Sequence, residues 1–140
     1  MLYNRSAGLN RLEEMCQSGE AVSVAFVDLT EFKSLNDRNG HKTGDEVLLE
    51  VGRRLAASVR PSDLVARIGG DEFLIASQHP DLQARLEQIF AQPIQTSHGA
   101  LQVGGDVGSI SVNRQDEVDD ILERADALMY SRKRAAKALA

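Results

Sequence analysis

The sequence has few cysteines and few aromatic residues, and its acidic residues outnumber its basic ones. Cys16 is the single cysteine, so the chain carries neither a disulfide framework nor a cysteine-based zinc cluster, and a reducing cytosol fits it. Aromatic residues make up 4% of the chain and the net charge is −5, which argues against a general nucleic-acid binder with a basic face. No apolar run is long enough to span a bilayer, and no stretch has the pattern of a signal peptide. We therefore expect a cytoplasmic domain that contacts neither nucleic acid nor membrane.

The length and the spacing of the apolar residues predict one domain with a sheet covered by helices. A chain of 140 residues can bury a core and corresponds to a single domain, residues 1–140. Apolar residues at helical spacing predict helices at 6–17, 31–39, 43–59, 80–92 and 117–137. Apolar runs predict strands at 21–27, 65–68 and 73–76, and one or two more within 94–112. This order of elements is typical of a sheet with helices on its faces.

Capping residues predict where two of the helices begin. Thr30 is the expected N-cap of the helix over 31–39, and Gly40 is its expected end. Thr43 and Glu46 have the spacing of a capping box and should open the following helix.

The segment Arg67-Ile68-Gly69-Gly70-Asp71-Glu72-Phe73 is the most informative feature of the sequence. It lies between two predicted strands, so the glycines and the acids fall at the tip of a hairpin. A glycine pair lets the backbone approach a ligand closely and adopt positive φ angles. Two adjacent carboxylates on such a tip suit a hard cation. Taken alone, however, a glycine–acid segment of this kind is often only a turn.

A second group of polar residues lies upstream with fixed spacing. It runs through Val27-Asp28-Leu29-Thr30-Glu31-Phe32-Lys33-Ser34-Leu35-Asn36-Asp37, followed by Gly40-His41 and Gly44-Asp45. This segment matches the pattern D-x-D-x-F-K-x-x-N-D-x-x-G-H-x-x-G-D at every fixed position except Thr30. Together with the intact letters GGDEF downstream, it makes the chain resemble the GGDEF domains of diguanylate cyclases. That family joins two GTP molecules into cyclic di-GMP.

The resemblance implies a fold and a setting. GGDEF domains are α/β proteins, specifically α+β sandwiches with a central, mostly antiparallel sheet flanked by helices, and they are related to nucleotide cyclases and polymerase palms. Leu2-Tyr3-Asn4-Arg5 looks like the end of the family's L-T-G-L-x-N-R motif, so we expect a fragment of a longer multidomain signalling protein. The upstream part of such bacterial proteins is usually a sensory or receiver domain, and the parent protein can be attached to the membrane.

The resemblance also implies the residues of a metal site. Asp28 and Asp71 are the expected carboxylate ligands, assisted by the Leu29 carbonyl, for two Mg²⁺ or Mn²⁺ ions per active site. Asp71 and Glu72 are the expected catalytic acids near the attacking 3′-hydroxyl. Either Asp71 or a metal-bound water can take the proton from that hydroxyl. For Asp28 the alternative is capping of the following helix, but Thr30 already suits that role.

The expected phosphate contacts come from three elements. By resemblance, the backbone amides of Glu31 and Phe32 hold the β- and γ-phosphates at a helix N-terminus, with Lys33 nearby. Phe32 is better explained as a core side chain, and Lys33 without its neighbours would be an ordinary solvated lysine. The remaining expected contacts lie on the hairpin and the final helix: Gly69, Gly70, Lys133 and Lys137. Lys137 stands where the family often has an arginine and supplies only a point charge.

Asn36 and Asp45 are the expected readers of the guanine base. A carboxylate accepts hydrogen bonds from the N1–H and the exocyclic amine of guanine, which adenine does not offer. An acid in the first turn of a helix is also favourable without any ligand, so Asp45 has a second explanation.

Arg60-Pro61-Ser62-Asp63 has the form R-x-x-D. An arginine at a helix end suits the helix dipole. The distance of this segment from Gly69, however, matches the product-inhibition site of the family, in which the arginine binds cyclic di-GMP and the aspartate orients it. We therefore expect Arg60 and Asp63 to form an inhibitory product site.

The expected function is metal-dependent synthesis of cyclic di-GMP from two GTP molecules across a homodimer, with feedback inhibition by the product. The alternative is a catalytically weak or inactive GGDEF domain that binds GTP or cyclic di-GMP as a regulatory module.

The sequence departs from the family pattern at a few positions. Thr30 removes an acid near the metals, and Ser109-Ile110-Ser111 replaces the usual S-I-G. Gly104-Gly105-Asp106 repeats part of the hairpin motif without its flanks, and we expect a strand bend or bulge there.

Overall fold

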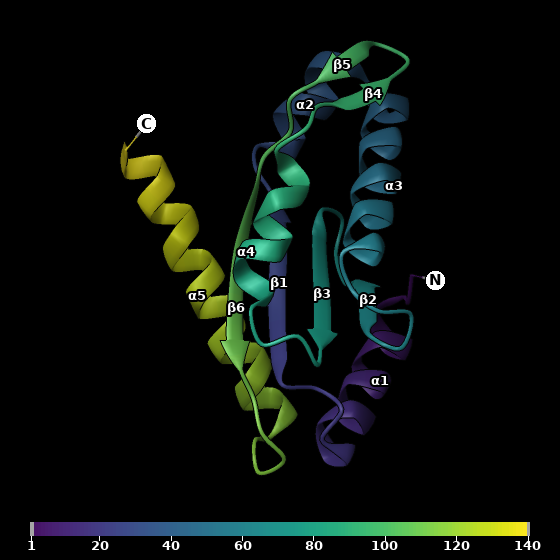
Figure 1. The fold of residues 1–140 in the computed structure, drawn as a ribbon. Coiled ribbons are helices and arrows are strands. Elements are labelled where there is room, and N and C mark those ends of the chain that lie inside the picture. Colours follow the sequence, from purple (N-terminus) through teal and green to yellow (C-terminus); the bar gives the residue numbers. More distant parts are fainter. Residues whose placement is uncertain (1, 140) are drawn as a thin grey trace.

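The sheet at the centre of the domain has four antiparallel strands. The structure, a computed structural model, describes residues 2–139. The strand order is β2-β3-β1-β6, and each pair of neighbours is antiparallel (Figure 1). These strands are β1 (Ser23–Leu29), β2 (Leu64–Arg67), β3 (Glu72–Ser77) and β6 (Gly105–Ser111). The predicted mixed fold with a mostly antiparallel sheet is confirmed.

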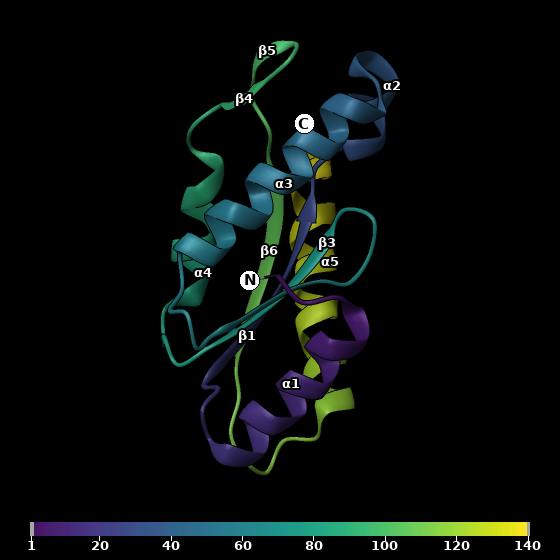
Figure 2. The ribbon, with the colours of Figure 1, turned by 90° about the vertical axis from the view of Figure 1, so that its right-hand side faces the viewer.

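Helices cover both faces of the sheet. α1 (Arg5–Ser18) and α5 (Val118–Leu139) pack on one face, and α3 (His41–Ala57) and α4 (Leu82–Glu87) pack on the other. Figure 2 shows α4 and α5 on opposite sides of β6. Buried residues at four-residue spacing form the stripe that each long helix packs on the sheet: Val47, Val51 and Leu55 in α3, and Ile121, Ala125 and Met129 in α5. In residues 2–139, no helix combines the length and the apolar character needed to cross a membrane.

β1 divides its side chains between the two core layers. All of its residues are buried. Val27 and Leu29 belong to the layer under α3 and α4, whereas Val24 and Phe26 belong to the layer under α1 and α5. Since side chains alternate along a strand, Asp28 points to the face that α5 covers. The central buried strand therefore places an acid near its end, on the α5 side.

A short helix and a second sheet form one end of the molecule. α2 (Phe32–Asn39) follows β1, and the 3-10 turn η1 (Gln88–Phe90) leads into the hairpin of β4 (Ile94–Thr96) and β5 (Gly99–Leu101). Figure 1 shows α2 and this hairpin beside the start of α3.

Both predicted helix starts are wrong. Glu31, not Thr30, is the N-cap of α2, which has no side-chain cap. α3 begins at His41, so Thr43 and Glu46 lie within the helix and do not form a capping box. Thr43 Oγ1 lies 2.6 Å from His98 Nδ1, and Glu46 accepts a hydrogen bond from Ser97 Oγ, also at 2.6 Å. Contacts with the β4–β5 hairpin have replaced the local capping bonds.

The segment 80–112 also differs from its prediction. Helix is limited to α4 and η1, and three strands follow rather than one or two. The Arg54 guanidinium fixes the chain after this short helix, because it donates 2.8 Å hydrogen bonds to the carbonyls of Ile89, Gln92 and Pro93. The predicted bend or bulge at 104–106 is wrong as well, since β6 pairs with β1 in unbroken register from Gly105 onward.

Candidate active site

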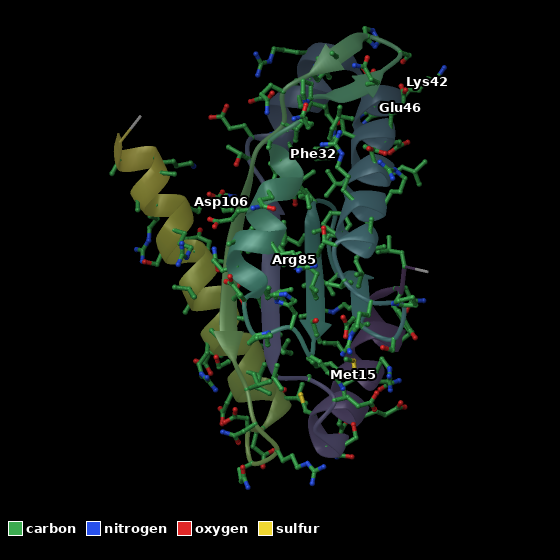
Figure 3. The ribbon with its side chains drawn as sticks, viewed as in Figure 1. Met15, Phe32, Lys42, Glu46, Arg85 and Asp106 are labelled. Carbon is green, nitrogen blue, oxygen red and sulfur yellow. The ribbon has the colours of Figure 1, made fainter. Side chains whose placement is uncertain are left out.

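Three acids lie in a row across one end of the main sheet. Asp28 on β1 is directly opposite Glu72 on β3 and Asp106 on β6. Side chains that are directly opposite in an antiparallel pair point to the same face. The three acids therefore share the face that α5 covers, and Figure 3 shows Asp106 on the side of β6 toward α5.

Asp28 is a buried acid with one satisfied oxygen and one unsatisfied oxygen. The residue is only 6% exposed. Its Oδ2 accepts a hydrogen bond from Lys133 Nζ at 2.5 Å, whereas its Oδ1 has no hydrogen-bond partner among the described residues. Buried polar atoms nearly always have a partner, and ionised carboxylates are preferred ligands of hard cations. The free oxygen is therefore suited to a metal ion.

The hairpin between β2 and β3 brings Asp71 to the end of β1. The Leu29 N–H donates to the Asp71 carbonyl at 3.1 Å, and Arg67 donates to the glycine carbonyls of the hairpin tip at 2.8–3.2 Å. Burial, followed by the nearby charge of Asp28, raises the pKa of Asp71, and the same two causes raise the pKa of Glu72. Both carboxyls therefore hold a proton more readily than free ones.

The two glycines of the tip differ in their surroundings, and neither adopts an unusual backbone angle. Neither Gly69 nor Gly70 uses the positive φ angles that glycine permits. A Cβ atom at Gly70 would meet nothing within 4 Å. The absence of side chains at the tip thus keeps its backbone accessible to a ligand.

No three His, Cys, Asp or Glu side chains of the described chain converge closely enough to hold a metal ion unaided. Magnesium usually takes one or two carboxylates and completes its shell with water and phosphate oxygens. Asp28, Asp71 and the Leu29 carbonyl lie at one end of the sheet and fit that smaller donor set.

A cavity of about 320 Å³ lies beside the acids. The residues that line it come from β1, the turn after β1, α2, the hairpin, β6 and α5: Leu29, Thr30, Glu31, Phe32, Lys33, Asp71, Asp106, Lys133, Ala136 and Lys137. The hydrogen bond to Asp28 raises the pKa of Lys133, so this ammonium remains charged. Acids on the sheet side and three lysines on the helix sides suit a polyanion that binds together with a cation.

The turn between β1 and α2 exposes the start of a helix to this cavity. Glu31 has a left-handed φ of 51°, the only positive φ of a non-glycine residue in the described chain. Glu31 and Phe32 line the cavity, and no side chain caps α2, so backbone N–H groups of its first turn are available to an anion. The Phe32 ring is half-buried and packs against the core, as the sequence predicted.

Asn36 lies against the first turn of α3, next to Asp45. Asn36 Oδ1 is buried and has no hydrogen-bond partner within residues 2–139. A Cβ atom at Gly44 would lie 1.7 Å from this oxygen, so only glycine permits the approach. Asp45 is the next residue along and is exposed. An unsatisfied amide and an exposed carboxylate therefore lie close together, in the region expected to bind a base.

Arg60 and Asp63 lie away from the acids, near the other end of β3. The Asp63 carboxylate accepts 2.9 Å hydrogen bonds from the Arg60 N–H and from Ser77 Oγ. The Arg60 side chain is 55% exposed, with its Nε 3.8 Å from Asp63 Oδ2, and it also bonds to the Gln78 side chain. A cavity of about 370 Å³ adjoins this pair. The arginine thus projects from a fixed base toward open space.

A larger cavity of about 700 Å³ lies between α3 and α4, away from the acids. The arginines in its wall already have partners: Arg53 and Arg54 both bond to Glu50, and Arg54 also binds the carbonyls after α4. These contacts lower the pKa of Glu50 to about 2. The smaller cavity is the better candidate site, because Asp71, Asp106 and Lys133, the partner of Asp28, all line it.

Asp106 is the site residue that the sequence analysis missed. Burial raises its pKa, and Thr30 Oγ1 donates a hydrogen bond to its Oδ2 at 3.4 Å. Its position depends on the register between β1 and β6, which pairs Asp106 with Asp28, 78 residues earlier in the sequence. The alternation Asp106, Gly108, Ile110 within a predicted strand was the available signal, but it does not reveal the partner strand.

Comparisons with known proteins agree with this geometry. Residues 1–138 match the family described as "Diguanylate cyclase, GGDEF domain". The diguanylate cyclase VdcA of Vibrio cholerae is 32% identical over 144 aligned residues, which cover 94% of this chain and 42% of VdcA. The GGDEF domain of TpbB (YfiN) from Pseudomonas aeruginosa superposes with a TM-score of 0.87 at 31% identity, covering 96% of this chain and 86% of that one.

A third similar structure is the GGDEF domain of DgcB from Caulobacter crescentus, solved in complex with cyclic di-GMP. Its TM-score is 0.81 at 26% identity, over 96% of this chain and 85% of that one. The chain spans less than half the length of the curated relatives that it matches. The family match over nearly the whole sequence shows that the chain belongs to the GGDEF domain family of diguanylate cyclases.

Proposed function

We propose that this domain is a diguanylate cyclase that condenses two GTP molecules into cyclic di-GMP and releases pyrophosphate. The observation that carries the proposal is the free, buried oxygen of Asp28 beside an intact hairpin with Asp71 and Glu72. A folded domain without a ligand function has no reason to retain such an oxygen, because an unsatisfied buried acceptor costs stability.

Asp28, Asp71 and the Leu29 carbonyl are the proposed ligands of two Mg²⁺ or Mn²⁺ ions. When bound, the ions neutralise phosphate charge and lower the pKa of the attacking 3′-hydroxyl. Asp71 and Glu72 are the proposed catalytic acids, and their raised pKa values favour acceptance of the hydroxyl proton once they are ionised.

The rest of the site is proposed to bind GTP. The first-turn N–H groups of α2 and the lysines that line the cavity, Lys33, Lys133 and Lys137, suit the triphosphate. Gly69 and Gly70 allow the nucleotide to approach the hairpin. Asn36 and Asp45 suit the guanine edge, where the unsatisfied Asn36 oxygen would gain a donor.

Synthesis should require two copies of the domain. We propose that each domain binds one GTP at this cavity, so that a second domain must present the other substrate. We therefore propose a homodimer in which two sites face each other, assembled in the longer protein by an upstream sensory or receiver domain.

Incubation with GTP and Mg²⁺ over a range of protein concentrations tests the proposal, with the nucleotides separated by chromatography. Cyclic di-GMP should form, and its rate should rise more steeply than linearly with protein concentration. Asp71→Asn is the matched control and should form none. Mg²⁺-dependent binding of GTP without product at the highest concentration would instead support the regulatory binding module.

Arg60 and Asp63 are the proposed product-inhibition site. The exposed Arg60 side chain suits the guanine and phosphate of cyclic di-GMP, and Asp63 holds its backbone in place. Arg60→Ala should keep the initial rate and lose inhibition by added cyclic di-GMP. Inhibition that persists unchanged in this variant would contradict the assignment.

A further inference from the structure

Asp106 has a position that the family motif does not explain. It lies directly across from Asp28 in the β1–β6 ladder and lines the same cavity as Asp71. Among the described residues the one hydrogen bond to its carboxylate comes from Thr30 Oγ1, and at 3.4 Å this bond is long. A carboxylate can accept about four hydrogen bonds, so most of the acceptor capacity of Asp106, which lines the cavity, is unused within the described chain.

Thr30 and Asp106 are fixed as a pair by the backbone. The Thr30 N–H donates to the Gly104 carbonyl at 2.9 Å, which holds the turn after β1 against the start of β6. Both side chains line the cavity. Position 30 is also the one fixed position of the upstream pattern where an acid is replaced, so the negative charge missing there is present on the neighbouring strand instead.

We propose that Asp106 is an acidic positioning residue at the edge of the metal site, and that it supplies in this chain the negative charge that position 30 lacks. This inference rests on the metal site of the proposed function. The free Oδ1 of Asp28, in a residue 6% exposed, independently indicates a cation at this end of the sheet. Asp106 acts from the edge, because no three acids of the described chain converge as direct ligands.

The experiment measures how much Mn²⁺ is needed to bind a GTP analogue that cannot react. The probe is GMPCPP, with a methylene group between the α- and β-phosphorus atoms, and binding is followed by calorimetry at a series of Mn²⁺ concentrations. Asp106→Val should raise the half-saturating Mn²⁺ concentration about tenfold, the effect expected for a residue that supports direct ligands. Asp106→Asn should raise it similarly, which guards against a packing effect of valine.

Moving the acid provides the decisive variant. Thr30→Asp combined with Asp106→Val should return the half-saturating Mn²⁺ concentration to within about twofold of that of the unaltered domain. This remaining difference is much smaller than the roughly tenfold increase expected for Asp106→Val alone. Asp120→Asn, an exposed acid at the start of α5, is the charge-matched control and should change nothing. Melting curves without metal identify any variant that fails to fold.

The outcomes separate this inference from the function on which it rests. If Asp28→Asn loses Mn²⁺-dependent binding while Asp106→Val and Asp106→Asn do not change it, the metal site stands and the role of Asp106 is refuted. Failure of Thr30→Asp to rescue Asp106→Val would refute the exchange of charge between the two positions. Absence of Mn²⁺-dependent binding in the unaltered domain would overturn the proposed function itself.

Discussion

Two buried aspartates, Asp28 and Asp63, lie near opposite ends of β3. They differ in how many of their carboxylate oxygens accept hydrogen bonds. Asp63 is 9% exposed, and its Oδ2 accepts bonds from the Arg60 N–H and Ser77 Oγ. Asp28 is 6% exposed, and its Oδ1 has no partner in the described chain. Burial by itself therefore does not distinguish a structural acid from a ligand. Both oxygens of Asp63 accept hydrogen bonds within the fold, whereas Asp28 has one oxygen paired with Lys133 and a second oxygen that suits a ligand.

The largest difference between the two acids should appear in catalysis. Asp28→Asn removes the charge that a cation needs, so we expect the rate of cyclic di-GMP synthesis to fall on the order of 10³-fold. The melting temperature should change little, because the substitution removes the charge on the unpartnered Oδ1 and also the ion pair with the partly exposed Lys133 ammonium, and these effects oppose each other. Chromatographic rates and thermal melts of the same samples test both parts. A large loss of stability would place Asp28 with Asp63 as a structural acid.

Asp63→Asn should give the reverse pattern. The NH2 group of the new amide must face either the Gln78 N–H at the Oδ1 position or the Arg60 N–H at the Oδ2 position, so in both orientations a buried donor meets another donor. We expect a loss of about 2–3 kcal/mol in the free energy of unfolding, within the range for such groups. Urea unfolding measures this loss, and the initial rate of synthesis at a temperature where the variant is folded should change little. Unchanged stability would show that these hydrogen bonds do not distinguish the two acids.

Asn36 Oδ1 is a second buried oxygen without a hydrogen-bond partner in the described chain, and it lies where we propose that the guanine base of GTP binds. Gly44→Ala would place a methyl group against it, so the amide must move away. We expect KM for GTP to rise about tenfold while kcat changes little, because a uniform binding contact is weakened. Gly52→Ala is the matched control: it lies two turns later in α3, where an added Cβ has its nearest contact at 3.5 Å. An equal effect of both substitutions would indicate a general perturbation of α3.

The sequence predicted those features whose cause is local. The four longer helices, β1 and the β2–β3 hairpin follow from apolar periodicity and from the glycine pair. The row of Glu72, Asp28 and Asp106 was predicted only in part, because strand register depends on residues far apart in the chain. The helix starts at Thr30 and Thr43 were predicted wrongly for the same reason. Partners on other elements, Asp106 and His98, take the hydroxyls that local rules assign to capping.

The smallest expected effect is the pH dependence of stability at the acid end of the sheet. The pKa values of Asp71 and Glu72 are raised above their ordinary values of 3.8 and 4.5. Between the ordinary and the raised values, the folded domain binds more protons than the unfolded chain, so these two groups make it less stable as pH rises through that window. Urea unfolding in EDTA should show that Asp71→Asn combined with Glu72→Gln gains stability relative to the unaltered domain as pH increases. If the difference in unfolding free energy between the two proteins stayed constant across this pH window, neither burial nor the charge of Asp28 would affect the pKa values of these carboxyls. The contrast between the two ends of β3 would then depend on Asp28 alone.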